Sequence, residues 1–551
     1  MNKIPDYIKE IIAIVATMVM LSIIHAPYDQ VLLAPVAYVP LVLTFSKTRK
    51  PKRFILFTFL ASIGYWMFNI YWLINIIAIG WIGASAIMAL FILLFVWALA
   101  RAKQTGWGCW IYLPIIVTGI EFFYGGIFGG FKWHLLGHSL YKNLEFIQIA
   151  DITGVAGITF LIAMLNGLVC DIIMHQSIKS LKLPITVCAI AVASVIVYGK
   201  YRLQTEPQNF TQGPLIAIVQ SNVPSTVKED KYEGMNILEG LFKVSEKALA
   251  SGAELLVWPE TIVSSAINSE FLIYMKEDSE PWQYHKKIKS FTDGRTYLLT
   301  GATALKVGEV DGENKVTDQY NSAFLYSPNN GSFPVRYDKI HLVPFGEYIP
   351  PKNIDWIRNI FLAFNPYDYD YTLTAGENLT RFQIKINEKE WDFSAMICYE
   401  DTDAQLNRKL TYSKDKGKAD WLLNISNDGW YVWYEDRKVK PSSELPQRTA
   451  ISVFRAVENR ITLMRSVNTG ISCKIDPLGR IVDGYIDGTL PENVFDRQAV
   501  EGYFTDRPEI DSRVTFFTQY GTLFSKLTGV LFVILIILSY AKKPRKKAAD
   551  K

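Results

Sequence analysis

The sequence of 551 residues has few cysteines and no excess of charge of either sign. Its five cysteines are too few for a disulfide-stabilised scaffold, and none has the spacing of a metal site. Lysine and arginine number 57 against 53 aspartates and glutamates, a net charge of +4, which excludes a nucleic-acid binder with a basic face. Glycine and proline are not enriched, so a low-complexity chain is excluded. We therefore expect no metal, no other cofactor and no nucleic-acid partner.

Hydrophobic residues are abundant instead, at 50% of the chain, and their distribution argues against a purely soluble protein. A membrane-spanning helix needs about 20 apolar residues, because lipid offers no partner for an unpaired backbone group. Apolar runs of this kind fill the first 200 residues and return near the end of the chain. We predict seven spans followed by a soluble part and an eighth span, at about 9–25, 31–46, 54–75, 79–100, 108–128, 148–174, 183–199 and 520–541.

Basic residues cluster in alternate loops between these spans. Five lie in 46–53, others follow the fourth and sixth spans, and the tail reads KKPRKK. All of them lie on one side of the membrane if the amino terminus is cytoplasmic, as the positive-inside rule requires. We therefore predict that both termini are cytoplasmic and that residues 201–515 lie on the outer side.

The soluble part has the pattern of an α/β domain. Apolar, strand-like runs occur at 214–223, 254–260, 296–305, 322–328, 393–400, 421–428 and twice within 460–477, with helical patterns at 239–250 and 444–459. We predict three parts: a membrane bundle of about seven helices at 1–200, a catalytic domain at 201–515, and a last span with a basic cytoplasmic tail at 516–551.

Three strand ends carry reactive side chains. Glu260 follows a proline that ends an apolar run, Lys339 lies near a turn, and Cys398 lies where an apolar run meets polar residues. A thiol at such a strand-to-helix elbow lies near backbone N–H groups and a positive helix end, both of which favour the thiolate. Taken singly, a buried cysteine is usually a small hydrophobe, and a Lys–Glu pair is usually a surface ion pair.

Together the motifs resemble a known family. WPE at 258–260, K-x-x-L-V-P-F-G-E at 339–347 and CYE at 398–400, in this order, resemble the carbon–nitrogen hydrolase (nitrilase) superfamily. The longer contexts YDKIHLVPFGEYIP, NISNDGW, FRAVENR and NTGIS, with the flanking membrane helices, narrow the resemblance to the apolipoprotein N-acyltransferase family. The resemblance implies a multi-span membrane bundle joined to a nitrilase-like α/β domain with the αββα sandwich fold.

The resemblance also implies a Glu-Lys-Cys triad. Cys398 would be the nucleophile, Glu260 the general base, and Lys339 the cation that stabilises the tetrahedral oxyanion, which agrees with the chemistry that a thiol nucleophile needs. Three further residues match supporting positions: Glu347, Tyr399 and Glu400. Lys228 and Glu229 occupy a region in which the family often has a tryptophan.

The reaction implied is a ping-pong acyl transfer without a cofactor. An acyl chain passes from a membrane phospholipid to the cysteine as a thioester, and then to the α-amine of diacylglyceryl-cysteine on an apolipoprotein, the last step of lipoprotein maturation. The location implied is the bacterial inner membrane, with the catalytic domain on the periplasmic side.

An apolar, aromatic segment at 354–364 interrupts the soluble part. Its hypothetical role is a lid that dips into the bilayer and admits acyl chains, formed by Trp356, Phe361 and Phe364; an ordinary buried helix explains the pattern equally well. Cys473 lies on a strand, where we expect it to be buried rather than bridged to Cys398.

Two other functions fit part of the pattern. A membrane-tethered nitrilase-type amidase would use the same triad with water as the acceptor, but it would need one anchor rather than about eight spans. A non-catalytic transport or lipid-binding scaffold would be expected to carry ionisable residues within its spans, and apart from Glu121 these are nearly absent.

Overall fold

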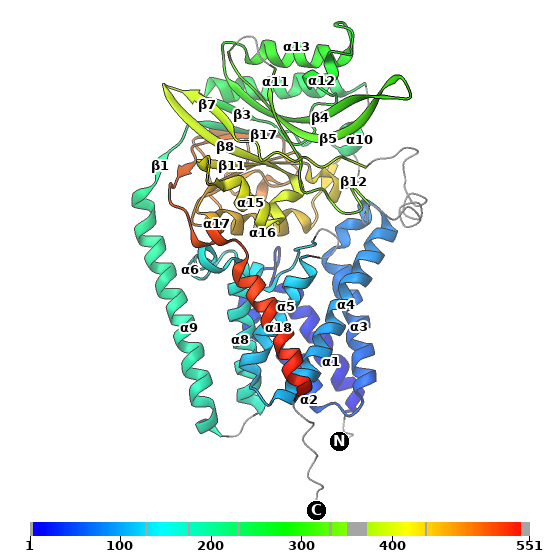
Figure 1. Cartoon of the computed structure of the whole chain (residues 1–551), viewed down its shortest axis with the longest axis vertical. Helices are drawn as coiled ribbons and strands as arrows, with labels where there is room; N and C mark the ends of the chain where they lie inside the picture. The colour runs from blue at the N-terminus through cyan, green and yellow to red at the C-terminus, as the bar shows by residue number, and fades with distance from the viewer. Residues whose placement is uncertain are drawn as a thin grey trace, which may run out of the picture. The chain divides into compact units, whose positions relative to one another are not determined.

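A computed structural model describes residues 4–126, 130–174, 177–228, 232–329, 333–349, 372–435 and 438–541 (Figure 1). The chain divides into two compact units. One is helical and consists of Met1–Thr205 and Tyr520–Lys551, and the other is Glu206–Gln519.

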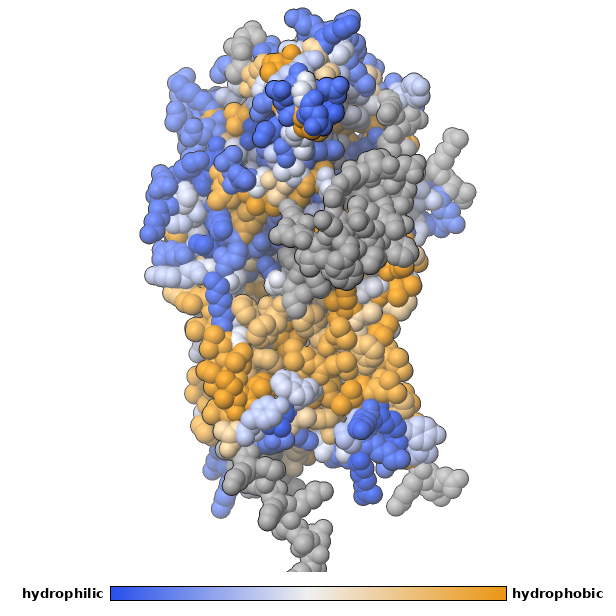
Figure 2. Space-filling model, turned by 45° about the vertical axis from the view of Figure 1, so that its right-hand side comes forward, coloured by the Kyte–Doolittle hydropathy of each residue, from blue (hydrophilic) through white to orange (hydrophobic). Residues whose placement is uncertain are grey.

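Long helices make up most of the helical unit. They are α1 (Asp6–Ile23), α3 (Pro51–Asn69), α4 (Ala78–Ala102), α5 (Cys109–Tyr124), α8 (Val155–Met174), α9 (Ile178–Thr205) and α18 (Leu523–Ala541). Shorter helices connect them: η1 (Val31–Val36), α2 (Val39–Lys47), η2 (Tyr71–Asn75), η3 (Lys103–Thr105), η5 (Leu136–Leu140), α6 (Leu144–Ile147) and α7 (Ala150–Thr153). Hydrophobic side chains cover the face of this unit that is visible in Figure 2.

Four helical segments in the described part of the chain are long and apolar enough to cross a membrane: Ala78–Thr105, Val155–Met174, Lys179–Asn209 and Leu523–Ala541. The sequence predicted eight spans, so the other four differ from the expectation in length or apolarity. The run at 31–46 is divided into η1 and α2, with prolines at positions 35 and 40 that lack a backbone N–H. The predicted run at 148–174 contains a candidate span but is shorter than expected, because it is divided at Gly154, whose φ of +64° ends α7 before α8 begins.

Glycines let two helices of this unit approach closely. A Cβ atom on Gly119 of α5 would overlap Phe532 of α18, and one on Gly529 of α18 would overlap Phe122 of α5. Interfaces of this kind between small and large residues are typical of helices packed in a membrane, where dispersion rather than the hydrophobic effect drives contact.

Glu121, the ionisable residue noted within a predicted span, holds a loop in place. Its carboxylate accepts hydrogen bonds from the Leu136 N–H (2.7 Å) and the Thr159 hydroxyl (2.8 Å). The carboxylate therefore joins α5, η5 and α8, and the contacts explain its presence without a transport role.

The second unit contains two large β-sheets between layers of helices (Figure 1). In the seven-stranded sheet the order is β16-β17-β2-β3-β4-β5-β6, and in the five-stranded sheet it is β15-β14-β11-β8-β7. The pairs β2–β3, β3–β4, β8–β11 and β11–β14 are parallel, and the remaining pairs in both sheets are antiparallel.

The strands of the first sheet are β2 (Ile216–Gln220), β3 (Leu255–Val257), β4 (Tyr297–Val310), β5 (Glu313–Tyr326), β6 (Val335–Asp338), β16 (Asp487–Gly488) and β17 (Gly502–Asp506). Those of the second are β7 (Phe382–Ile386), β8 (Lys389–Ile397), β11 (Trp421–Ser426), β14 (Thr462–Val467) and β15 (Cys473–Ile475). Three two-stranded sheets pair β1 (Thr211–Gln212) with β18 (Glu509–Ile510), β9 (Tyr412–Ser413) with β10 (Gly417–Lys418), and β12 (Trp433–Glu435) with β13 (Lys438–Lys440).

Helices cover the outer face of each large sheet. α11 (Gly234–Ala250) packs on β2 and β17, whereas α15 (Ala404–Thr411) packs on β8 and α16 (Glu444–Asn459) on β14. Shorter helices of this unit are η6 (Glu206–Asn209), α10 (Ser225–Lys228), α12 (Ser269–Leu272), α13 (Glu280–Thr292), η7 (Cys398–Thr402), η8 (Asp428–Tyr431), η9 (Val494–Arg497) and α17 (Phe516–Tyr520).

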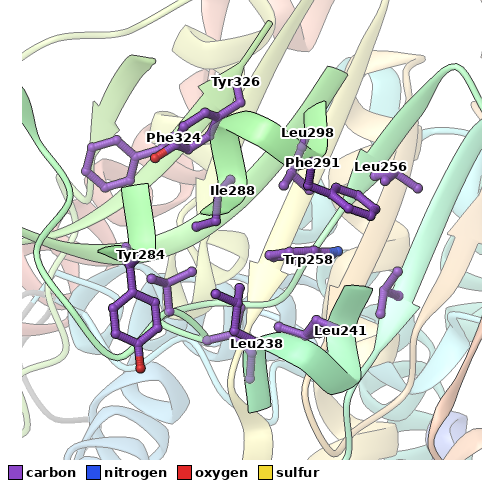
Figure 3. Close-up of a cluster of buried hydrophobic side chains, with 14 of the residues drawn as sticks. Leu238, Leu241, Leu256, Trp258, Tyr284, Ile288, Phe291, Leu298, Phe324 and Tyr326 are labelled. Carbon is purple, nitrogen blue, oxygen red and sulfur yellow. The ribbon is translucent and has the colours of Figure 1, made fainter. Parts of the chain in front are cut away.

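A hydrophobic core lies between the seven-stranded sheet and its helices (Figure 3). Leu238 and Leu241 of α11 pack there with Trp258, which follows β3, and with Ile288 and Phe291 of α13. These residues are buried, and each full burial of such a side chain stabilises the fold by about 1.5–3 kcal/mol. The predicted α/β class is confirmed: each predicted strand contains or overlaps a strand of the structure, and the predicted helix at 444–459 is α16.

Candidate active site

Cys398 lies at the end of β8, where the strand becomes the short helix η7. It is the first residue of that helix and has a φ of +52°, a left-handed conformation that is uncommon for a residue with a side chain. The Asn424 side chain on the neighbouring strand β11 donates to the Cys398 carbonyl oxygen (3.2 Å). The predicted elbow is therefore present, and the thiol is only 5% exposed.

Glu260 lies beyond the end of β3, before Thr261, which also has a positive φ (+42°). Its carboxylate is buried and held at both oxygens. The Asn321 side chain donates to Oε1 (2.6 Å), and the backbone N–H of Asn427 donates to Oε2 (2.7 Å). Asn321 belongs to the first sheet and Asn427 follows β11 of the second, so residues from both sheets position this carboxylate.

Lys339 follows β6, and its side chain is fully buried. Its Nζ atom lies 2.6 Å from Glu347 Oε1 and 3.7 Å from Glu260 Oε1. Asn321 also reaches Glu347, at 3.4 Å. The structure thus brings the predicted lysine and both predicted glutamates into one contact group.

The charges of this group stabilise one another. Burial alone would raise the pKa of Glu260, but the ammonium groups of Lys339 and Lys228 lower it below the ordinary value, and the carboxylate is ionised. Burial would lower the pKa of Lys339, but Glu347, Cys398 and Glu260 raise it above the ordinary value, so the ammonium is also charged.

The thiol of Cys398 responds in the opposite way. Burial and the nearby Glu260 carboxylate raise its pKa to about 12, although the cations Arg448 and Lys339 oppose this. The sequence-based expectation of a thiolate favoured by a helix end is therefore wrong for the resting protein. Burial is a tertiary effect that outweighs the dipole of a short helix, so the thiol is protonated near neutral pH.

Glu400 and Tyr399 have supporting positions beside the thiol. The Glu400 carboxylate is buried and accepts hydrogen bonds from the Tyr337 hydroxyl (2.8 Å) and from the backbone N–H groups of Ile340 (2.7 Å), His341 (3.0 Å) and Ile397 (2.7 Å). It therefore joins the loop that carries Lys339 to the strand that carries Cys398. The Tyr399 ring stacks on His341, with centroids 5.4 Å apart.

Two of the remaining sequence-based hypotheses have different outcomes. Cys473 is buried on β15 and its thiol is free, as is that of Cys398, so the expectation of burial is confirmed. The candidate lid residues Trp356, Phe361 and Phe364 lie outside the described residues.

Sequence reasoning missed several residues that hold the site together: Asn321, Asn427, Lys228, Asp401 and Arg448. Asn321 had no signal, because it lies within an ordinary strand. Asn427 belongs to the NISNDGW motif, which marked a strand end without indicating that its backbone N–H binds the carboxylate. Arg448 is buried in the middle of a helix, a rare position for arginine, but this burial is known only from the structure.

Known proteins match both units. Residues 18–168 match the model of the apolipoprotein N-acyltransferase N-terminal domain, and residues 215–492 match that of the carbon-nitrogen hydrolases. The apolipoprotein N-acyltransferase of Geobacter metallireducens is 28% identical over 536 residues, which cover 93% of this chain and 91% of the relative. That of Rickettsia prowazekii is 26% identical, covering 91% and 94%. The crystal structure of an amidase from Nesterenkonia sp. aligns at 17% identity with a TM-score of 0.35, covering 55% of this chain and 92% of the amidase.

Proposed function

The chain belongs to the apolipoprotein N-acyltransferase family, enzymes of the nitrilase superfamily, and we propose that it transfers the acyl chain through a thioester on Cys398. The observation that carries this proposal is the arrangement of an ionised carboxylate and a buried ammonium around a strained, buried thiol. A lipoprotein acceptor and an acyl donor follow from the family. The donor is proposed to be a membrane phospholipid, and the acceptor group is the α-amine of diacylglyceryl-cysteine.

In the first half-reaction, Glu260 takes the proton of the Cys398 thiol as the sulfur attacks the ester carbonyl of the phospholipid. The tetrahedral intermediate carries a negative oxygen, which the Lys339 ammonium stabilises; one such donor is worth about 3–4 kcal/mol in comparable sites. The ester C–O bond then breaks, and protonated Glu260 returns the proton to the leaving oxygen. The products are a lysophospholipid and an acyl thioester.

In the second half-reaction, the neutral amine of the acceptor attacks the thioester carbonyl. Glu260 takes a proton from the attacking nitrogen, and Lys339 again stabilises the oxyanion. Breaking the C–S bond releases the sulfur, which regains the proton from Glu260, and an amide remains. The high pKa of the thiol suits this order, because the resting cysteine stays protonated until an ester is in position.

The chain is a membrane protein with several candidate spans, and its orientation is part of the proposal. Basic residues at 46–53 lie at the junction of α2 and α3, and Lys179 and Lys182 lie near the start of α9. The positive-inside rule then favours cytoplasmic termini and a periplasmic catalytic unit at about 201–515 in the bacterial inner membrane. Single cysteines placed at residues 50 and 311 of a variant in which all five native cysteines are replaced should react with a membrane-impermeant maleimide only from the cytoplasmic and the outer side, respectively.

The test of the chemistry is the intact mass of the purified protein after incubation with phospholipid. We expect one added acyl chain in the wild type and in Cys473→Ala, which removes a second buried thiol, and none in Cys398→Ala. A synthetic diacylated lipopeptide should discharge the acyl group and gain it as an amide. An acyl group that water removes as fast as the lipopeptide would favour a hydrolase instead, and an acyl group that persists on Cys398→Ala would contradict the proposal.

A further inference from the structure

Lys228 contacts the backbone of the proposed base, Glu260. It is the last residue of α10, and its Nζ atom donates to the Glu260 carbonyl oxygen (3.0 Å) and to the Thr261 hydroxyl (2.7 Å). With its side-chain amide oriented so that the oxygen faces Lys228, Asn427 also accepts from the same Nζ atom, at 3.1 Å. Asn427 is the residue whose backbone N–H binds the Glu260 carboxylate. The Lys228 ammonium therefore contacts both Glu260 itself and a residue that holds its carboxylate in place.

The contact with the Glu260 carbonyl occurs where the backbone turns away from β4. The Trp258 N–H, the Pro259 carbonyl and then the Val263 N–H bond to β4, whereas the Glu260 carbonyl between them accepts from Lys228 instead. Thr261 then turns the chain with a φ of +42°. A conformation of this kind is costly unless the surroundings hold it, and a buried carbonyl without a donor would add to that cost.

The charge of Lys228 matters as well as its hydrogen bonds. Glu260 has one ammonium, Lys339, beside its Oε1 atom and a second, Lys228, beside its carbonyl. Both cations favour the ionised carboxylate, and Lys228 is the second of them in its effect on the pKa of Glu260. Only the ionised form can accept the thiol proton.

We propose that Lys228 is a positioning residue for Glu260, which fixes the backbone of the base and keeps its carboxylate ionised. This inference rests on the proposed function of the site, because it assigns a role to Lys228 through Glu260. Lys228 itself is not expected to touch the acyl donor or the acceptor.

The experiment measures the rate of acyl-enzyme formation from phospholipid as a function of pH in Lys228→Met, Lys228→Gln and Lys228→Arg. Removing the positive charge raises the pKa of Glu260, so the acid limb of the profile should move to higher pH by about one unit in the Met and Gln variants, with a rate at neutral pH at least about tenfold lower. Gln retains a hydrogen-bond donor, which keeps the test informative if the Met variant does not fold. Lys228→Arg retains the charge and should keep the acid limb of the wild type.

Thr261→Val is the matched control, because it removes the shortest contact of Lys228 without removing the charge. Its acid limb should stay in place. A Lys228→Met or Lys228→Gln enzyme that is slower but keeps the wild-type acid limb would overturn the inference, since that result indicates packing alone. If the wild type forms no acyl-enzyme, the proposed function fails; infrared difference titration of the Glu260 carboxyl against Glu260→Gln then tests Lys228 directly, and the pKa of Glu260 should rise in the Met and Gln variants.

Discussion

Lys339 donates a hydrogen bond of 2.6 Å to Glu347, eight residues later in the same loop. The other carboxylate oxygen of Glu347 accepts from the Val343 N–H (2.8 Å), so the loop binds its own lysine through this glutamate. The ammonium is thereby held at 3.7 Å from Glu260, close enough to stabilise its ionised carboxylate. We therefore predict that Glu347 supports the proposed site by positioning the Lys339 ammonium.

Glu347→Gln should slow acyl-enzyme formation by about a hundredfold, because a cation that is mispositioned at the oxyanion forfeits most of its effect on the transition state. The measurement is the single-turnover rate from intact mass. Glu388→Gln is the control, since Glu388 makes an equally short contact with Lys385 (2.6 Å) on the exposed surface and should change nothing. Equal rates in Glu347→Gln and wild type would show that Lys339 is positioned without Glu347.

Glu260→Gln should lower the pH at which the Cys398 thiolate forms and at the same time abolish acyl transfer. The Glu260 carboxylate raises the pKa of Cys398 by like-charge repulsion, so its removal should lower the pH at which the thiolate forms from about 12. The same change removes the proposed base and should abolish acyl transfer. Thiolate absorbance against a Cys398→Ala blank gives the midpoint. A midpoint that stays in place or rises would contradict the electrostatic coupling of these two residues.

Glu400→Gln should change how stability depends on pH. Burial raises the pKa of Glu400 from 4.5 to about 7, in spite of its donors, so the folded state favours the protonated acid. A carboxyl with a raised pKa contributes most to stability below pH 4.5 and loses that contribution as the pH rises through about 7. The wild type should therefore lose unfolding free energy between these limits, whereas Glu400→Gln should lose less.

Tyr337→Phe is the companion to that measurement. It removes one donor to Glu400 and leaves three backbone N–H groups, so we expect a loss of about 1 kcal/mol in the free energy of unfolding. Because the Tyr337 hydroxyl lowers the pKa of Glu400, its loss should extend the pH-dependent loss of stability to slightly higher pH. If the unfolding free energy of Glu400→Gln changes with pH as much as that of the wild type, another group in this unit, and not Glu400, causes the change.

The sequence predicted the residues whose local pattern differs from their neighbourhood. Glu260 follows a proline, and Cys398 ends an apolar run, so both stand out at strand ends without any knowledge of the fold. Asn321 reaches the Glu260 carboxylate and Lys228 reaches the Glu260 backbone carbonyl, from positions 61 and 32 residues away, and nothing in their local sequence indicates these contacts. Long-range contacts of polar side chains depend on how the strands pair, which is a property of the whole sheet.

The protonation state of Cys398 and the membrane spans also depend on features that the local sequence pattern does not show. The local pattern indicated a helix end that favours a thiolate, but burial at 5% exposure, set by the two sheets, has the larger effect. Apolar runs likewise predicted the long helices α4, α8, α9 and α18, whereas the run at 31–46 is interrupted by prolines whose effect on a helix depends on their position in each turn.

A buried ion pair fixes the turn that begins with Cys398, the proposed nucleophile. Asp401, in the same short helix as Cys398, is fully buried and lies 3.1 Å from Arg448 Nε. Arg448 also lies 3.3 Å from both Asp428 and Glu444. Because two of these carboxylates flank strand ends of the second sheet, the arginine joins the nucleophile turn to the scaffold.

Arg448→Met should therefore reduce the free energy of unfolding by about 3–5 kcal/mol, since it leaves the buried Asp401 and Asp428 with the more distant Arg465, at 3.9 and 3.5 Å. Arg480→Met is the control, because Arg480 pairs with Asp476 at 3.2 Å near the surface, where loss of a pair costs at most about 1 kcal/mol. Arg448 also lowers the pKa of the Cys398 thiol, so its removal should shift thiolate formation to higher pH, opposite to Glu260→Gln. A stable Arg448→Met protein with an unchanged thiol would show that neither the turn nor its charge depends on this arginine.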